Sequence, residues 1–168
     1  MSTDLVRPAP SEDLPVPKSW RMKARFEQYG SGGDRSVWFN VWEGKERVDS
    51  LGEVDLAVFT VLEMARERAA EAQMPYSPVW ASSADFAHVA NEFKTANERQ
   101  ISSGYVSLSL LGRRGKDEGW VQSDTRGVKI AVWRLTKRGH WALKRMRLEM
   151  DALERKAATQ GISALTHK

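Results

Sequence analysis

The chain of 168 residues contains no cysteine. This absence excludes disulfide scaffolds, cysteine-ligated zinc, iron–sulfur clusters and thiol nucleophiles. The longest stretches without a charged residue, 72–84 and 100–112, are thirteen residues each, whereas a membrane-spanning helix needs about 20 apolar residues. The N-terminus also lacks a basic region followed by an apolar one. We therefore expect no membrane segment, no secretory signal and a cytoplasmic location.

Histidine is scarce as well, and the three that are present offer few general bases for a serine nucleophile. Asp85, His88 and Glu92 share one side of a predicted helix, but they do not make a complete ligand set for a metal. The Gly-Ser-Gly-Gly segment at 30–33 lacks the Lys-Ser/Thr of a phosphate-binding loop and favours a turn. We predict a protein that is not an enzyme and has no metal or other cofactor.

Charge is unevenly distributed along the chain, whose formal net charge is +4. Residues 1–112 hold 12 Lys and Arg against 16 Asp and Glu, while residues 113–168 hold 14 against 6. The C-terminal third is therefore strongly basic, which favours nucleic acid as a partner.

The N-terminal part predicts an extended tail followed by a β-hairpin. Four prolines fall within residues 1–17, which we interpret as a disordered tail. Apolar and charged residues alternate from Trp20 to Glu27, as in a half-buried strand, and Val37–Trp42 is a second aromatic run. We therefore expect a β-hairpin extension over residues 18–49.

Two helices are predicted after the hairpin. Ser50-Leu-Gly-Glu53 matches a capping box, which predicts a helix over Val54–Ala70. Its first half is apolar almost all round, so we expect it to be central. A second helix should begin near Ser82 or Ser83, because Phe86 and three further apolar residues then recur at helical spacing.

Residues 101–115 fit either a strand or a helix, and periodicity does not decide between them. Beyond them, 120–123 and 128–135 are predicted strands joined by a turn at Asp124–Gly127. Thr136 should then cap a long helix that runs to about Thr159.

That last helix carries apolar residues spaced 3, 4, 3 and 4, which is the pattern of a packing seam about two heptads long. The seam could pack on the protein's own core or form a contact between two subunits. The residues predicted for dimerisation are Leu143, Met146, Met150 and Leu153.

Two motifs in the C-terminal half carry a family resemblance: Gly119-Trp-Val and, after a basic segment, Leu135-Thr-Lys-Arg-Gly139. With the order of elements over residues 53–159, they resemble the winged helix-turn-helix DNA-binding superfamily in its MarR-like and PadR-like forms. The resemblance implies an α+β winged helix-turn-helix fold over residues 50–160, with the N-terminal hairpin, a long C-terminal helix and a tail at 161–168. It also implies a recognition helix at 102–114 and a wing at 120–135.

The function implied is sequence-specific binding of double-stranded DNA by a homodimeric transcriptional regulator. Basic side chains between 113 and 138 are numerous enough to form one cationic surface, and serine hydroxyls can meet phosphates or base edges. The predicted DNA-binding residues are Ser102, Ser103, Tyr105, Ser107, Ser109, Arg113, Arg114, Lys116, Arg126, Lys129, Lys137 and Arg138.

Two alternative functions remain open. A DNA-binding replication or plasmid-maintenance factor would use the same residues. A non-catalytic interaction or assembly protein would instead use the aromatic hairpin as its binding face. That hairpin holds Trp20, Trp38 and Trp42, three of the seven tryptophans, which either close a core, form a partner interface or stack on single-stranded nucleic acid.

Overall fold

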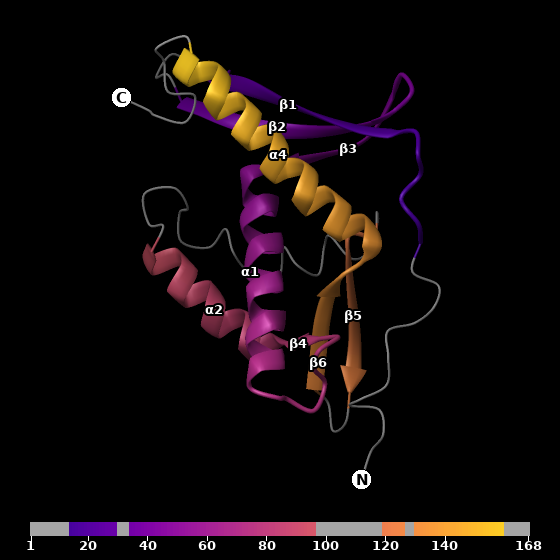
Figure 1. Ribbon diagram of the computed structural model, residues 1–168, viewed down its shortest axis with the longest axis vertical. Coiled ribbons are helices and arrows are strands. Elements are labelled where there is room, and N and C mark those ends of the chain that lie inside the picture. The colour runs from indigo at the N-terminus through magenta and orange to yellow at the C-terminus, as the bar shows by residue number, and fades with distance from the viewer. Residues whose placement is uncertain (1–13, 30–33, 97–118, 127–129, 160–168) are drawn as a thin grey trace. The chain divides into compact units, whose positions relative to one another are not determined.

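The computed structural model describes residues 14–29, 34–96, 119–126 and 130–159 (Figure 1). Over these residues the protein is a mixed α+β chain with three helices and two small antiparallel sheets, which confirms the predicted class. The chain divides into two compact units. Unit 1 comprises Met1–Pro15 and Ala57–His140, and unit 2 comprises Val16–Leu56 and Trp141–Lys168.

Unit 2 contains a sheet of three strands: β1 (Trp20–Tyr29), β2 (Asp34–Glu43) and β3 (Glu46–Gly52), in the order β1-β2-β3. The predicted hairpin is confirmed, since β1 and β2 pair antiparallel from Trp20–Glu43 to Tyr29–Asp34. The third strand was not predicted, and the expected boundary at residues 49 and 50 falls inside it. The fully buried apolar residues of this sheet are Val37, Phe39 and Val41 of β2 and Leu51 of β3.

The first helix, α1 (Glu53–Glu71), begins close to the predicted position, but the predicted capping box is wrong. Ser50 lies in β3 and not at the helix cap. The backbone N–H of Gly52 donates to the Asp55 carboxylate at 2.7 Å, and Glu53 accepts from the backbone N–H of Val37 at 2.8 Å. Strand pairing therefore continues to Gly52, the residue before the helix, and the Glu53 side chain adds one further bond to β2. The expected central position is confirmed within unit 1, where five α1 side chains are fully buried: Val58, Phe59, Val61, Leu62 and Ala65.

In unit 1 the helix α2 (Ser83–Ala96) follows a two-residue strand, β4 (Ala81–Ser82). The helix begins where it was predicted, near Ser82 or Ser83, and Ser82 caps it. Its hydroxyl accepts from the backbone N–H of Asp85 at 3.0 Å, and the Asp85 carboxylate accepts from the Ser82 N–H at 2.9 Å. Both bonds satisfy donors that a helix start leaves open.

The sheet of unit 1 has the order β4-β6-β5, with β5 at Val121–Arg126 and β6 at Ile130–Leu135. The expected hairpin is present, but the predicted turn at Asp124–Gly127 is wrong. Asp124, Thr125 and Arg126 pair with Val132, Ala131 and Ile130, so the ladder includes three of the four residues whose composition suggested a turn.

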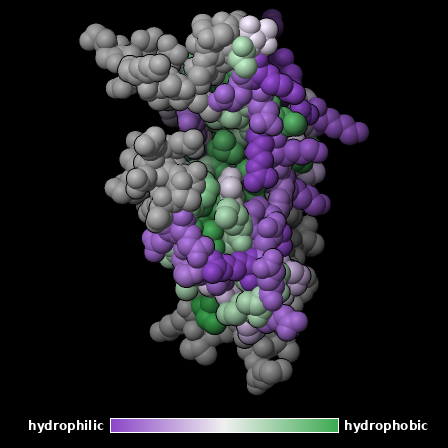
Figure 2. Space-filling model, turned by 60° about the vertical axis from the view of Figure 1, so that its left-hand side comes forward, coloured by the Kyte–Doolittle hydropathy of each residue, from purple (hydrophilic) through white to green (hydrophobic). Residues whose placement is uncertain are grey.

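The last helix, α4 (Lys137–Thr159), is confirmed over its full predicted length. Thr136 caps it by accepting from the backbone N–H of Gly139 at 3.1 Å. Among the described residues, none of the helices is both long and apolar enough to span a bilayer. On the face drawn in Figure 2, hydrophobic residues lie mostly recessed between hydrophilic ones.

Candidate nucleic-acid interface

Most of the predicted DNA-binding residues lie outside the described residues. This holds for Ser102, Ser103, Tyr105, Ser107, Ser109, Arg113, Arg114, Lys116 and Lys129, and with them for the choice between helix and strand at 101–115. Arg126 is the last residue of β5, paired with Ile130. Lys137 and Arg138 begin α4, where Lys137 is exposed and Arg138 is half-buried.

Hydrogen bonds join the two motifs on which the family resemblance rests, Gly119-Trp-Val and Leu135-Thr-Lys-Arg-Gly139. The backbone N–H of Thr136 donates to the carbonyl of Trp120 at 3.1 Å, and its hydroxyl donates to the carbonyl of Gly119. A Cβ at Gly139 would overlap the Trp120 carbonyl oxygen. Glycine at this position therefore lets the first turn of α4 sit directly on the residue that precedes β5.

Basic residues crowd this first turn of α4. The first turns of α1 and α2 carry the acidic residues Glu53, Asp55 and Asp85, whereas that of α4 carries none. Cations at a helix N-terminus oppose the helix dipole, and backbone N–H groups there attract anions. Lys137 and Arg138 are thus placed at a cost to the helix, in a position suited to an anionic partner.

One member of the basic segment is structural. Arg134 is only 9% exposed, and its Nε donates to Gln122 Oε1 at 2.7 Å. Its guanidinium carbon lies 5.7 Å from the ring centroid of Trp80, within the range of a cation–π interaction. The expectation that Arg134 belongs to an exposed cationic surface is therefore wrong.

The predicted dimerisation residues divide between interior and surface. Leu143 and Met146 are 4% and 0% exposed in the single chain, while Met150 and Leu153 are half-buried. The first half of the seam therefore belongs to the protein's own core, and Met150 and Leu153 remain the accessible part of it.

The polar side of α2 is engaged in contacts within unit 1. Asp85 accepts from the Tyr76 hydroxyl at 2.5 Å, and Glu92 bonds Arg68 at 2.8 Å and lies 3.2 Å from His88. Burial, together with the bond to Asp85, raises the pKa of Tyr76 to about 12. Within the described ranges, no group of three or more metal-ligating side chains is found.

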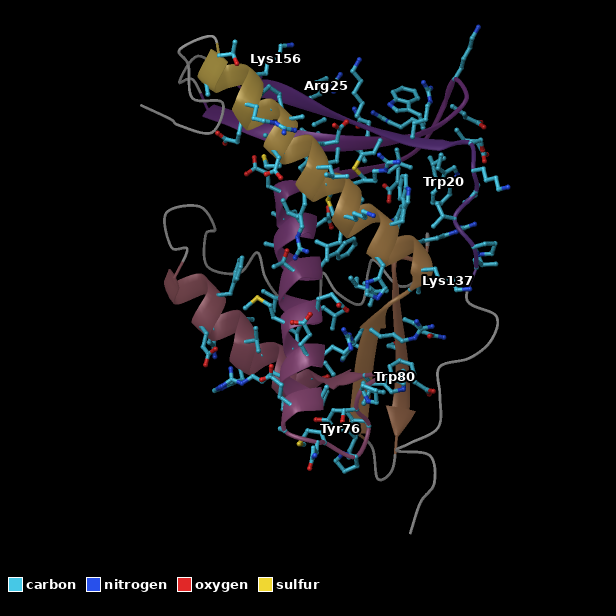
Figure 3. The ribbon with its side chains drawn as sticks, viewed as in Figure 1. Trp20, Arg25, Tyr76, Trp80, Lys137 and Lys156 are labelled. Carbon is cyan, nitrogen blue, oxygen red and sulfur yellow. The ribbon has the colours of Figure 1, made fainter. Side chains whose placement is uncertain are left out.

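The aromatic hairpin separates into two faces. Trp20 points to the side of the sheet along which α4 runs (Figure 3). Its ring centroid lies 5.8 Å from that of Trp141. Trp38 and Trp42 alternate with the buried residues of β2 and lie on the opposite face, where both are half-buried. Arg47 was missed as a member of that second face because β3 was not predicted.

A scan against protein-family models gives no match, and searches of curated proteins and of solved structures find none either.

Proposed function

We propose that this protein is a cytoplasmic, sequence-specific double-stranded DNA-binding protein that acts as a transcriptional regulator, with unit 1 as a winged helix-turn-helix domain. The observation that carries the proposal is the pairing of β4 with β6. It attaches the β5–β6 hairpin to the start of α2. A hairpin docked on consecutive helices is the arrangement that the family resemblance implies.

Three contacts fix the β5–β6 hairpin to the start of α2. Ala81 pairs with Trp133 and Ser82 with Val132. The indole N–H of Trp133 donates to the Ser83 hydroxyl at 2.8 Å. Because strand, cap and indole all join α2 to β6, the hairpin has a defined place relative to the helix, which a wing that meets DNA beside a recognition helix requires.

The distribution of charge also supports DNA binding by the β5–β6 hairpin and the start of α4. Arg126 at the end of β5 and Lys137 at the start of α4 belong to the basic C-terminal third. With Arg134 assigned to the interior, the remaining cations of the segment are those proposed to contact phosphates and bases. The residues proposed for direct base readout are Arg113 and Arg114, since an arginine side chain can bond guanine through two donors.

The test is fluorescence anisotropy of a labelled duplex of about three helical turns, titrated with protein over a salt series. Affinity should fall steeply with salt, by a slope of about 0.9 in log units per phosphate contact. The double variant Lys129→Gln/Lys137→Gln should reduce that slope by about 2. Lys144→Gln/Arg147→Gln removes the same charge from exposed positions of α4 and should leave the slope nearly unchanged.

Sequence preference is tested by selection from a random duplex library, which should return two half-sites about one helical turn apart if the protein binds as the proposed homodimer. Absence of duplex binding at low salt would overturn the proposal. Equal losses in the two double variants would show a general polyanion effect and would overturn it as well.

A further inference from the structure

The outer face of the sheet in unit 2 combines aromatic and basic side chains in regular rows. We define this outer face by three cross-strand rows that the pairing of β1, β2 and β3 creates. The rows are Arg25–Trp38–Gly52, Lys23–Asn40–Ser50 and Arg21–Trp42–Arg47.

We propose that the outer face binds single-stranded nucleic acid, with bases stacked on the tryptophans and phosphates on the flanking cations. The proposal does not depend on duplex binding by unit 1, because it uses different residues in the other unit.

Charge complementarity is the first argument. Four of the nine positions are cations, Arg21, Lys23, Arg25 and Arg47, all exposed, and none is acidic. Of the acidic residues in this sheet, Glu43, Glu46 and Asp49 occupy the alternate rows, which contain Trp20 and Met22. Glu27 and Asp34 lie on the same side of the strands as Arg25, but in the two pairs beyond the three rows. The three rows therefore carry positive charge only, which suits a polyanion.

Cation spacing is the second argument. Arg21, Lys23 and Arg25 are alternate residues of one strand, so their Cα atoms are separated by about 7 Å from one to the next. This is close to the separation of successive phosphates in an extended single strand. Arg25 projects from the side of the sheet opposite to Trp20 (Figure 3), away from the side where Trp20 meets Trp141.

The orientation of Trp38 is the third argument. A Cβ built at Gly52 lies 3.3 Å from Cζ3 of the indole and 3.6 Å from each of its ring neighbours, Cε3 and Cη2. The nearest atom and its two neighbours are almost equally distant, which is the pattern of a point above the ring plane and not beyond its edge. One face of the six-membered ring of Trp38 is therefore directed at Gly52, the last residue of β3, and a stacked base would take the opposite face.

Row composition explains why a single strand is favoured over a duplex. Trp38, Asn40 and Trp42 follow one another along the same face of β2, with Asn40 accepting from the Ser50 hydroxyl at 2.8 Å. Trp38 and Trp42 are only half-buried, which leaves indole surface for stacking with unpaired bases, whereas a duplex keeps its bases stacked inside. A sheet with aromatics on its central strand and cations beside them therefore matches unpaired nucleotides.

The test compares labelled oligothymidylate, oligouridylate and a mixed-sequence duplex by fluorescence anisotropy with the full chain. Trp42→Leu should weaken binding of the single strands about tenfold, whereas Trp42→Phe should retain most of it. Lys23→Gln/Arg25→Gln changes only exposed side chains and should lower the salt slope by about 1.4, since each phosphate of a single strand contributes about 0.7.

The matched control is Arg145→Gln/Lys156→Gln, which removes the same charge from exposed positions of α4 in unit 2 and should leave single-strand binding unchanged. The relative affinities for the two homopolymers assign the ligand as DNA or RNA. Unchanged single-strand affinity in Trp42→Leu and Lys23→Gln/Arg25→Gln would overturn the proposal. So would polyglutamate binding of equal strength and salt dependence, which would mark an acidic protein as the partner.

Duplex binding by the same variants separates this proposal from the proposed function. If Trp42→Leu and Lys23→Gln/Arg25→Gln weaken single-strand binding but leave duplex binding unchanged, both proposals stand. If duplex binding is absent from every form while single-strand binding depends on the outer face, only the proposed function of unit 1 fails.

Discussion

Arginine and tryptophan occur side by side in both sheets, but with opposite exposure. In unit 1, Arg134 is 9% exposed with its guanidinium carbon 5.7 Å from the Trp80 ring centroid. In unit 2, Arg25 is exposed and stands directly across the strands from half-buried Trp38. The same pair of residue types therefore supports the interior of one sheet and covers the surface of the other. A count of cations along a segment does not identify a binding surface until burial has been established.

The two units also use glycine differently, and this leads to the largest expected effect. A Cβ at Gly139 would overlap the backbone carbonyl of Trp120, whereas one at Gly52 would meet only the Trp38 side chain, at 3.3 Å. Gly139→Ala should lower the free energy of unfolding by about 3 kcal/mol. Gly52→Ala should change it by less than about 1 kcal/mol. Chemical denaturation of both variants measures the difference, and equal effects would contradict the close approach at Gly139.

The buried and exposed arginines provide the second prediction. Arg134→Gln removes a cation that bonds Gln122 and the Leu135 carbonyl inside the sheet, and should cost about 2 kcal/mol of unfolding free energy. Arg25→Gln, at an exposed position, should change it by no more than about 0.5 kcal/mol. The measurement is again the denaturation midpoint. A similar loss in both variants would remove the distinction between the sheets.

The third prediction concerns the helix starts. α2 is capped by the Ser82 hydroxyl, whereas α1 begins after Gly52 and relies on Asp55. Ser82→Ala should cost about 1 kcal/mol, and Ser82→Gly only a few tenths, since glycine tolerates the cap conformation. Thermal unfolding followed by circular dichroism gives the order of the three proteins. Wild-type stability in Ser82→Ala would show that the cap does not contribute.

The last prediction is a pH dependence confined to alkaline solution, so it has no effect on stability near neutral pH. The pKa of Tyr76 is raised from 10.0 to about 12 in the folded chain, by burial first and then by its bond to Asp85. The folded state thus holds this proton more tightly than the unfolded state, so the contribution is full below pH 10 and is lost as the pH rises to about 12. Tyr76→Phe should abolish this part of the decline. Denaturation over that pH range tests it, and an unchanged decline in the variant would assign it to other groups.

Much of the secondary structure follows from short-range patterns. Alternation identifies β1, the apolar spacing identifies α1 and α2, and Thr136 marks the start of α4. These signals work because side-chain direction repeats every two residues in a strand and every 3.6 in a helix, and because a cap bonds only the next turn.

The elements that were predicted wrongly or missed have a common cause: each depends on contacts between residues far apart in the sequence. β4 is two residues long and exists through pairing with Val132 and Trp133. Ser50 is three residues before Glu53, as a capping box requires, yet its backbone is in β3 and pairs with Asn40 of β2. The turn-like residues of β5 are likewise extended because β6 pairs with them.

The candidate sites show the same division. The basic third of the chain and the tryptophans of the first hairpin are properties of the linear sequence, and so is the alternation that puts Trp38 and Trp42 on one side of their strand. Burial of Arg134 beneath Trp80, the entry of Arg47 into the outer face and the contact of Gly139 with Trp120 arose only from folding. Local periodicity reports which way a side chain points, whereas its partner and its exposure depend on which segment packs against it.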